Sequence, residues 1–150
     1  MPKYQVTKTY GHNLGLSATF RQHRTDTHCK FLHGYALGVK LTFEADTLDQ
    51  RNWVLGFGDL KPVKKWLEET FDHRTLVAED DPDFNYFMEM HRKGLISMVA
   101  VKRVGCESFA EMIYHKTNQI VFEGLRRDGV RLVSVEVIEH GANSAIYYGE

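Results

Sequence analysis

Residues 29–44 read Cys-Lys-Phe-Leu-His-Gly-Tyr-Ala-Leu-Gly-Val-Lys-Leu-Thr-Phe-Glu. From Tyr35 to Glu44, a large apolar or aromatic side chain stands at every second position, which is typical of a β-strand with one buried face. The preceding segment, Cys29 to Tyr35, holds a thiol, an imidazole and a phenol. Because these groups directly precede the strand, the segment predicts a candidate active site at the mouth of that strand.

The composition predicts a single globular domain over residues 1–150, since 43% of the residues are hydrophobic and 12% aromatic. The formal net charge of -1 gives no general attraction to nucleic acid or to an anionic membrane. The chain has no run of about 18 apolar residues, and its first residues lack the apolar segment of a signal peptide. The two cysteines, Cys29 and Cys106, are too few for a disulfide framework, so we expect a cytoplasmic protein with reduced thiols.

Further strands are predicted on both sides of the opening stretch. A turn or bulge at residues 11–13 interrupts the first strand, and a hairpin turn at residues 141–143 separates the last two strands. Residues 95–101 are ambiguous and fit a short strand. The four predicted strands cover residues 4–9 resuming at 14–20, then 35–44, 132–138 and 145–148.

Apolar residues at helical spacing predict two main helices and a shorter one between them. Asp59 is the expected N-cap of the first helix, and Pro62 lies in its first turn, where a missing N–H costs little. A charged turn follows the last helix. The helices are predicted at residues 60–71, 84–92 and 107–122, and the charged turn at residues 124–129.

The order of the main elements is therefore strand, strand, helix, helix, strand, strand. This order predicts an α+β domain in which an antiparallel four-stranded sheet carries two main helices on one face. The edges of such an open sheet need covering, which favours association of subunits through strand edges.

Five segments resemble, in the same order, the motifs of one known family. The first carries a Cys-x-x-x-His-Gly-His motif, with Tyr35 in place of the last histidine. On these segments the chain resembles the 6-pyruvoyl-tetrahydropterin synthases and their bacterial relatives, the 6-carboxy-tetrahydropterin synthases, over nearly its whole length. The segments are residues 29–35, 56–61, 71–73, 105–110 and 135–139.

The resemblance implies the tunnelling fold, in which subunits close into barrels. It implies a homohexamer of two trimers, with active sites at subunit interfaces. It also implies one pterin-synthase-like domain over residues 1–150 and a small-molecule pterin as the partner, with no role for nucleic acid or membrane.

Roles for five residues follow from the resemblance. Cys29 corresponds to the catalytic base, and Asp72 with His73 to a proton relay. Glu107 and Glu139 correspond to carboxylates that hold the pterin ring. The chemistry is consistent with these roles, because a thiolate can remove a proton beside an imine-like carbon and a carboxylate can accept two parallel N–H bonds.

Each of these residues also has an ordinary structural interpretation. Cys29 fits a buried, inert cysteine, and His73 fits a cation at a helix C-terminus. Glu107 fits a first-turn carboxylate, and Glu139 fits a solvent-exposed end of a strand. Cys106 stands where the family usually has a small hydroxyl residue, and we interpret it as a helix-start residue rather than a nucleophile.

A Zn²⁺ cofactor held by three histidines is also implied by the resemblance. Of the three corresponding positions only His33 carries an imidazole, because Phe20 and Tyr35 occupy the other two. One hypothesis is a rearranged metal site made of His33, His23 and His28.

Other candidates and other outcomes stay open. His12 or Tyr35 are further candidates for the rearranged site. Alternatively the metal has been lost, the two aromatic residues line the pocket, and residues 22–28 serve a triphosphate or another substrate. The loop histidines are also consistent with simple solvated side chains.

The resemblance implies a lyase that acts on 7,8-dihydroneopterin triphosphate or a related pterin. The product would be 6-carboxy-tetrahydropterin, for queuosine or 7-deazaguanine biosynthesis, or a similar compound. The main alternative is a catalytically altered or inactive pterin- or purine-binding protein of the same fold. A side-chain aldolase is a third option, which is disfavoured because such relatives usually add a glutamate near the cysteine.

Overall fold

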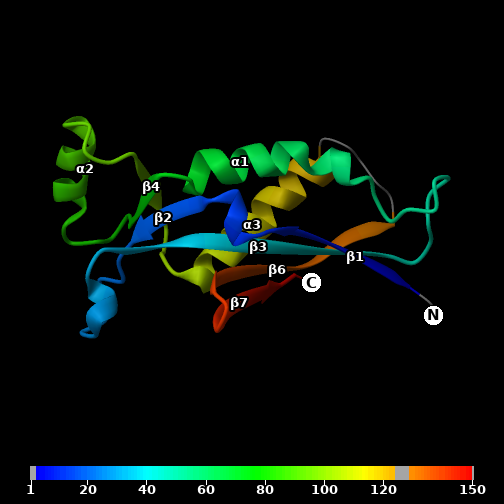
Figure 1. The fold of residues 1–150 in the computed structure, drawn as a ribbon, viewed down its shortest axis with the longest axis horizontal. Helices are drawn as coiled ribbons and strands as arrows, with labels where there is room; N and C mark the ends of the chain where they lie inside the picture. Colours follow the sequence, from blue (N-terminus) through cyan, green and yellow to red (C-terminus); the bar gives the residue numbers. More distant parts are fainter. Residues whose placement is uncertain (1–2, 124–128, 150) are drawn as a thin grey trace.

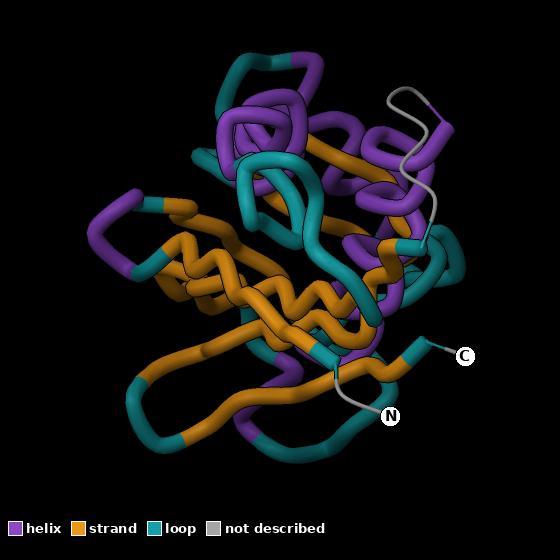
Figure 2. Tube along the Cα trace, turned by 90° about the vertical axis from the view of Figure 1, so that its right-hand side faces the viewer, coloured by secondary structure: helices purple, strands orange, loops and turns teal. Residues whose placement is uncertain are grey.

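The computed structural model describes residues 3–123 and 129–149, and it consists of a twisted sheet with helices packed against it (Figures 1 and 2). The strands are β1 Tyr4–Tyr10, β2 Leu16–Phe20, β3 His33–Ala45, β4 Arg74–Ala78, β5 Met98–Val101, β6 Val130–His140 and β7 Asn143–Tyr148. The α-helices are α1 Lys61–Phe71, α2 Phe84–Arg92 and α3 Cys106–Asn118. Short helical turns are η1 His12–Leu14, η2 His28–Lys30, η3 Phe57–Leu60 and the π-helical η4 Gln119–Glu123.

The long strand β3 is the centre of the sheet. Its first part pairs with β2, while its second part pairs with β1 along the same edge and with β6 along the other, all antiparallel. β7 pairs antiparallel with β6, whereas β4 runs parallel to β2 and β5 runs parallel to β4. The described strands therefore form one mixed seven-stranded sheet in the order β5-β4-β2-β3-β6-β7, with β1 beside β3.

The α+β class is confirmed, but the prediction of a purely antiparallel four-stranded sheet is wrong. The strand absent from the prediction is β4, whose last four residues, Thr75 to Ala78, are all buried. A short parallel strand that is buried on both faces shows no polar–apolar alternation, so the pattern that found the other strands could not find it. The ambiguous residues 95–101 contain β5, which pairs with β4.

Helix boundaries follow the predictions closely, with one correction. Asp59 lies inside η3 and does not cap α1, because Leu60 occupies the N-cap and makes no side-chain cap bond. Pro62 is in the first turn of α1 as predicted. α2 has the predicted bounds, and α3 continues through η4 as far as Glu123. The charged turn predicted at residues 124–129 lies, apart from Gly129, outside the described residues.

A chain of three aromatic rings joins the helices to the sheet. Phe109 of α3 packs edge-on against Phe71 of α1, with ring centroids 5.4 Å apart, and against Phe20 of β2 at 5.1 Å. All three side chains are at most 5% exposed. α1 and α3 therefore share one core with the end of β2, while α2 lies at the far end of the molecule beside β4 and β5 (Figure 1). Among the described helices, each is too short or too polar to cross a membrane.

The pairing of β2 with β3 depends on Gly34. This residue lies opposite Thr19, and a Cβ atom here would lie 2.7 Å from the carbonyl oxygen of Ala18. Because that distance is far below van der Waals contact, only glycine allows the two strands to approach this closely. The register then places Phe20 opposite His33, so both side chains lie on the same face of the sheet.

Replacing Phe109 with alanine should destabilise the fold strongly. The substitution removes a fully buried ring that contacts two others, so we expect a loss of about 3–5 kcal/mol in the free energy of unfolding. Urea denaturation followed by circular dichroism measures this loss. The matched control is Tyr86→Ala, whose side chain is 75% exposed and whose loss should stay within about 0.5 kcal/mol. Equal losses for the two variants would contradict the aromatic core described above.

Candidate active site

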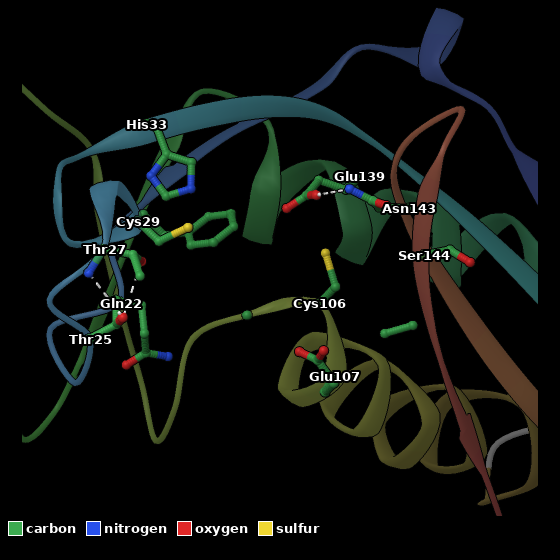
Figure 3. Close-up of a pocket in the computed structure, with 13 residues that line it drawn as sticks. Gln22, Thr25, Thr27, Cys29, His33, Cys106, Glu107, Glu139, Asn143 and Ser144 are labelled. Atoms are coloured by element: carbon green, nitrogen blue, oxygen red, sulfur yellow. Dashed lines mark hydrogen bonds between the residues drawn. The ribbon is translucent and has the colours of Figure 1, made fainter.

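A cavity of about 360 Å³ opens where β2, β3, α3 and the β6–β7 hairpin meet (Figure 3). Its walls come from the loop before η2, from His33 at the start of β3, from residues 105–107 at the start of α3 and from the hairpin. The volume falls in the range of small-molecule sites, about 300–1,000 Å³. Four elements distant in the sequence thus supply one site.

Cys29 lies in η2 and is partly exposed, with its Sγ atom directed into the cavity (Figure 3). The loop that carries it is closed by a hydrogen bond of 2.9 Å from the backbone N–H of Gln22 to the carbonyl of Cys29. Thr25 and Thr27 line the same wall, with their hydroxyl oxygens 3.1 Å apart. Cys29 is therefore an accessible thiol in polar surroundings and not a buried, inert one.

His33 faces the cavity from the first position of β3. Its Nδ1–H donates to the carbonyl oxygen of Phe31 over 2.7 Å, which assigns the proton to Nδ1 and leaves Nε2 as an acceptor. The imidazole packs against two rings, with centroid distances of 5.2 Å to Phe20 and 5.4 Å to Tyr35. His33 therefore offers one free nitrogen within an aromatic environment.

Glu139 reaches the cavity because β6 is irregular at this point. The pairing of β6 with β7 shifts register between Ile138 and His140, so Glu139 is the additional residue of a β-bulge. A bulge redirects one side chain out of the regular alternation. The carboxylate accepts a hydrogen bond of 3.4 Å from the side-chain amide of Asn143 (Figure 3) and is partly buried.

Tyr35 adds a second contact to the same carboxylate. Burial, and then the charge and hydrogen-bond acceptance of Glu139, raise the pKa of the Tyr35 phenol above its ordinary value. The phenol therefore stays protonated at neutral pH beside Glu139. Its ring also lies 6.2 Å from the ring of His140, which follows Glu139 in the chain.

The start of α3 forms the opposite wall of the cavity. Gly105 precedes the helix with a φ of 115°, a conformation that other residues rarely adopt. Cys106 follows at the helix start, and burial, with smaller contributions from the charges of Glu139 and Glu107, raises the pKa of its thiol to about 12. Glu107 is exposed at the cavity rim. The helix-start position predicted for Cys106 is correct, but the sequence did not place this residue in the cavity.

Asp72 and His73 form the predicted pair, but outside this cavity. α1 ends at Phe71, Asp72 is extended, and His73 has a φ of 58° in the left-handed region. The His73 Nδ1–H donates to Asp72 over 2.8 Å, and both residues are held by the backbone of Ser17 in β2. The His73 side chain is 86% exposed. Within one chain, Asp72 and His73 are hydrogen-bonded to each other, but neither residue lines the cavity that contains Cys29.

The histidines of the rearranged metal site are not brought together within the chain. His23 is largely buried and lies beside Asp80, 3.6 Å from its carboxylate, while His28 is exposed in η2 and does not line the cavity. His12 instead bonds the carbonyl of Ala36. Across residues 3–123 and 129–149, the structure shows no group of three or more His, Cys, Asp or Glu side chains that could hold a metal ion.

The donor set around His33 therefore does not fit zinc. A catalytic zinc site needs three protein ligands with nitrogen, sulfur or carboxylate donors. Phe20 offers only hydrocarbon, so within this pair only the Nε2 of His33 is free to bind a metal ion. Of the candidate residues, the structure brings together Cys29, His33, Glu107 and Glu139, and leaves His23 and His28 away from them.

Sequence reasoning missed several polar residues of the cavity wall. Asn143 and Ser144 belong to the hairpin that was predicted at residues 141–143, but no local pattern indicates which wall a hairpin tip faces. Thr25 and Thr27 were predicted only as part of the polar segment 22–28. The only sequence signal for these residues is their polarity near Cys29, and their meeting is a tertiary effect.

An accessible thiol, an imidazole and two carboxylates around a small-molecule cavity define a candidate enzyme site on an α+β scaffold. The family model for 6-pyruvoyl tetrahydropterin synthase matches residues 10–150. The chain therefore belongs to the 6-pyruvoyl tetrahydropterin synthase family.

Among named relatives, the 6-carboxy-5,6,7,8-tetrahydropterin synthase of Aquifex aeolicus is 25% identical and the alignment covers 99% of both chains. The protein of the same name from Rickettsia felis is 36% identical over 62 residues, which cover 41% of this chain and 45% of the relative. The chain thus matches less than half the length of this relative.

Solved structures share the fold. An uncharacterized protein from Wolinella succinogenes superposes with a TM-score of 0.84 at 23% identity, covering 100% of both chains. The 6-pyruvoyl tetrahydropterin synthase of Plasmodium vivax gives a TM-score of 0.74 at 13% identity, covering 100% of this chain and 99% of its own. At these identities the superpositions establish the fold alone.

The two cysteines should differ sharply in reactivity. With a pKa of about 12, Cys106 has a thiolate fraction at pH 8 of roughly one in ten thousand, and this fraction rises only as the pH approaches 12. We expect iodoacetamide at pH 8 to modify Cys29 and to spare Cys106 in the folded protein, as measured by peptide mass spectrometry. As a control, Cys29→Ser should take up label only after unfolding in urea. Rapid labelling of Cys106 in the folded protein would contradict the described burial.

Proposed function

We propose that this protein is a lyase that acts on 7,8-dihydroneopterin triphosphate or a closely related pterin. The observation that carries the proposal is the bulge at Glu139, which directs a carboxylate into the cavity that also contains Cys29. The names of the relatives and the membership of the family support the same substrate class. Formation of 6-carboxy-tetrahydropterin, as in the synthesis of 7-deazaguanine compounds such as queuosine, is the product we favour.

Binding of the ring would depend on Glu139. A pterin presents an amino group and a ring N–H side by side, and one carboxylate can accept both hydrogen bonds. Asn143 already orients this carboxylate from the protein side. Glu107 at the rim would add a second acceptor for the same ring edge or for the side chain of the pterin.

Cys29 would act as the general base. In its thiolate form it would take the proton from the side-chain carbon next to the pterin C6. The electron pair of that C–H bond would move into the adjacent imine, whose nitrogen would gain a proton. Thr25 and Thr27 line the wall beside Cys29 and would donate hydroxyl hydrogen bonds to an anionic group such as the triphosphate.

Complete sites would require more than one subunit. Asp72 and His73 do not line the cavity of their own chain, and the His73 ring is exposed. We therefore place the relay of one subunit against the cavity of a neighbour, in a homo-oligomer such as a homohexamer. The exposed outer edges of β1 and β7 would supply the pairing surfaces.

A pterin-binding protein without lyase activity is the second candidate. The observation that favours it is the presence of Phe20 and Tyr35 at two positions where the resemblance implies zinc ligands. The two candidates share the ring contact at Glu139 and differ only in the role of Cys29. Substitutions at these two residues therefore separate them.

Turnover of dihydroneopterin triphosphate by the purified protein tests the proposal. Cys29→Ala should lower kcat by more than about a hundredfold with little change in pterin affinity, because it removes the base. Glu139→Gln should weaken pterin binding, because it removes the charged acceptor. The matched control is Glu111→Gln, on the outer face of α3 beside Arg103, which should leave both quantities unchanged. Pterin binding without turnover by the unmodified protein would establish the second candidate, and absence of both would refute both.

Mixed oligomers test the shared site. Co-expression of Cys29→Ala with His73→Ala should restore activity that neither variant has alone. With random mixing, about a quarter of the sites would combine an intact Cys29 with an intact His73 from another chain. Activity assays on co-purified, differently tagged chains measure this. Mixed oligomers with no recovered activity would contradict a site built from two subunits.

A further inference from the structure

We propose that this pocket operates without a metal ion, and that an aromatic cluster of Phe20, His33 and Tyr35 has taken the place of a metal centre. The residues around His33 lack the three donor side chains that a zinc ion needs. Only the consequence for ligand binding rests on the proposed pterin function.

The three residues of the cluster lie together on one face of the sheet. The register pairs Phe20 with His33, and Tyr35 follows two residues later on the same face. The ring centroids are 5.2 Å apart for Phe20 and His33, 5.4 Å for His33 and Tyr35, and 6.1 Å for Phe20 and Tyr35. The three side chains meet at one point, as the ligands of a single metal ion do. Only His33, however, carries an imidazole.

Phe20 fixes the apolar character of the cluster. Its ring is 5% exposed and packs edge-on against Phe109, with centroids 5.1 Å apart. This packing in the core holds the ring in one rotamer. A divalent cation beside His33 would therefore lie against hydrocarbon on one side. Burying an ionic charge there without compensating ligands is strongly unfavourable.

Tyr35 closes the cluster on its other side. Its ring packs edge-on against His33 at 5.4 Å and lies 6.2 Å from the ring of His140. Neither Phe20 nor Tyr35 therefore supplies the imidazole that a three-histidine site needs at its position.

Metal analysis tests the inference directly. Protein purified without chelators from zinc-supplemented cultures should contain far less than one zinc ion per chain by mass spectrometry of the metals. The double variant Phe20→His with Tyr35→His should bind about one zinc ion per chain, because it restores three imidazoles on one face. The matched control, Phe20→Leu with Tyr35→Phe, should bind none.

Two results would overturn the inference. The first is about one zinc ion per chain in the unmodified protein that persists through dialysis and disappears in His33→Ala. The second is a double histidine variant that has the circular dichroism spectrum of the parent and takes up no zinc. Both readouts are independent of turnover, so they separate this inference from the lyase proposal.

Discussion

The close approach of β2 and β3 at Gly34 is the constraint on which the site depends. Because a Cβ atom at this position would lie 2.7 Å from the carbonyl oxygen of Ala18, the two strands can pair in this register only with glycine. That register sets Phe20 against His33 and places Tyr35 two residues later on the same face of the sheet. The loop between the strands then carries Cys29 back to the cavity. One glycine therefore links the packing of the core to the geometry of the candidate site.

The ionisable side chains of the site differ in how deeply they are buried. Cys106 and Tyr35 are both kept protonated by burial and by the nearby charge of Glu139. Glu139 itself is placed at the surface of the cavity by a β-bulge and accepts a hydrogen bond from Asn143. Cys29 is the other thiol of the chain and the more exposed one. This arrangement leaves one accessible thiol and one carboxylate at the cavity, which are the two groups that the proposed reaction requires.

The sequence predicted the elements that have regular patterns. The alternation of β3 and β6 and the helical spacing of α1 and α3 gave bounds within a few residues. It did not reveal β4, because a short strand that is buried on both faces has no alternation to detect.

For the site, the sequence located Cys29, His33, Glu107 and Glu139, which the structure brings together. It could not show that His23 turns to Asp80, or that the bulge at Glu139 aims a carboxylate inwards, since both depend on contacts between distant segments.

The central claim is a metal-free pterin pocket built on Glu139 and an aromatic cluster. The most direct measurement is calorimetric titration of the protein with neopterin, after passage over a chelating resin and again with added zinc. We expect the same affinity in both conditions and a weaker affinity for Glu139→Gln. Binding that appears only when zinc is added would contradict it.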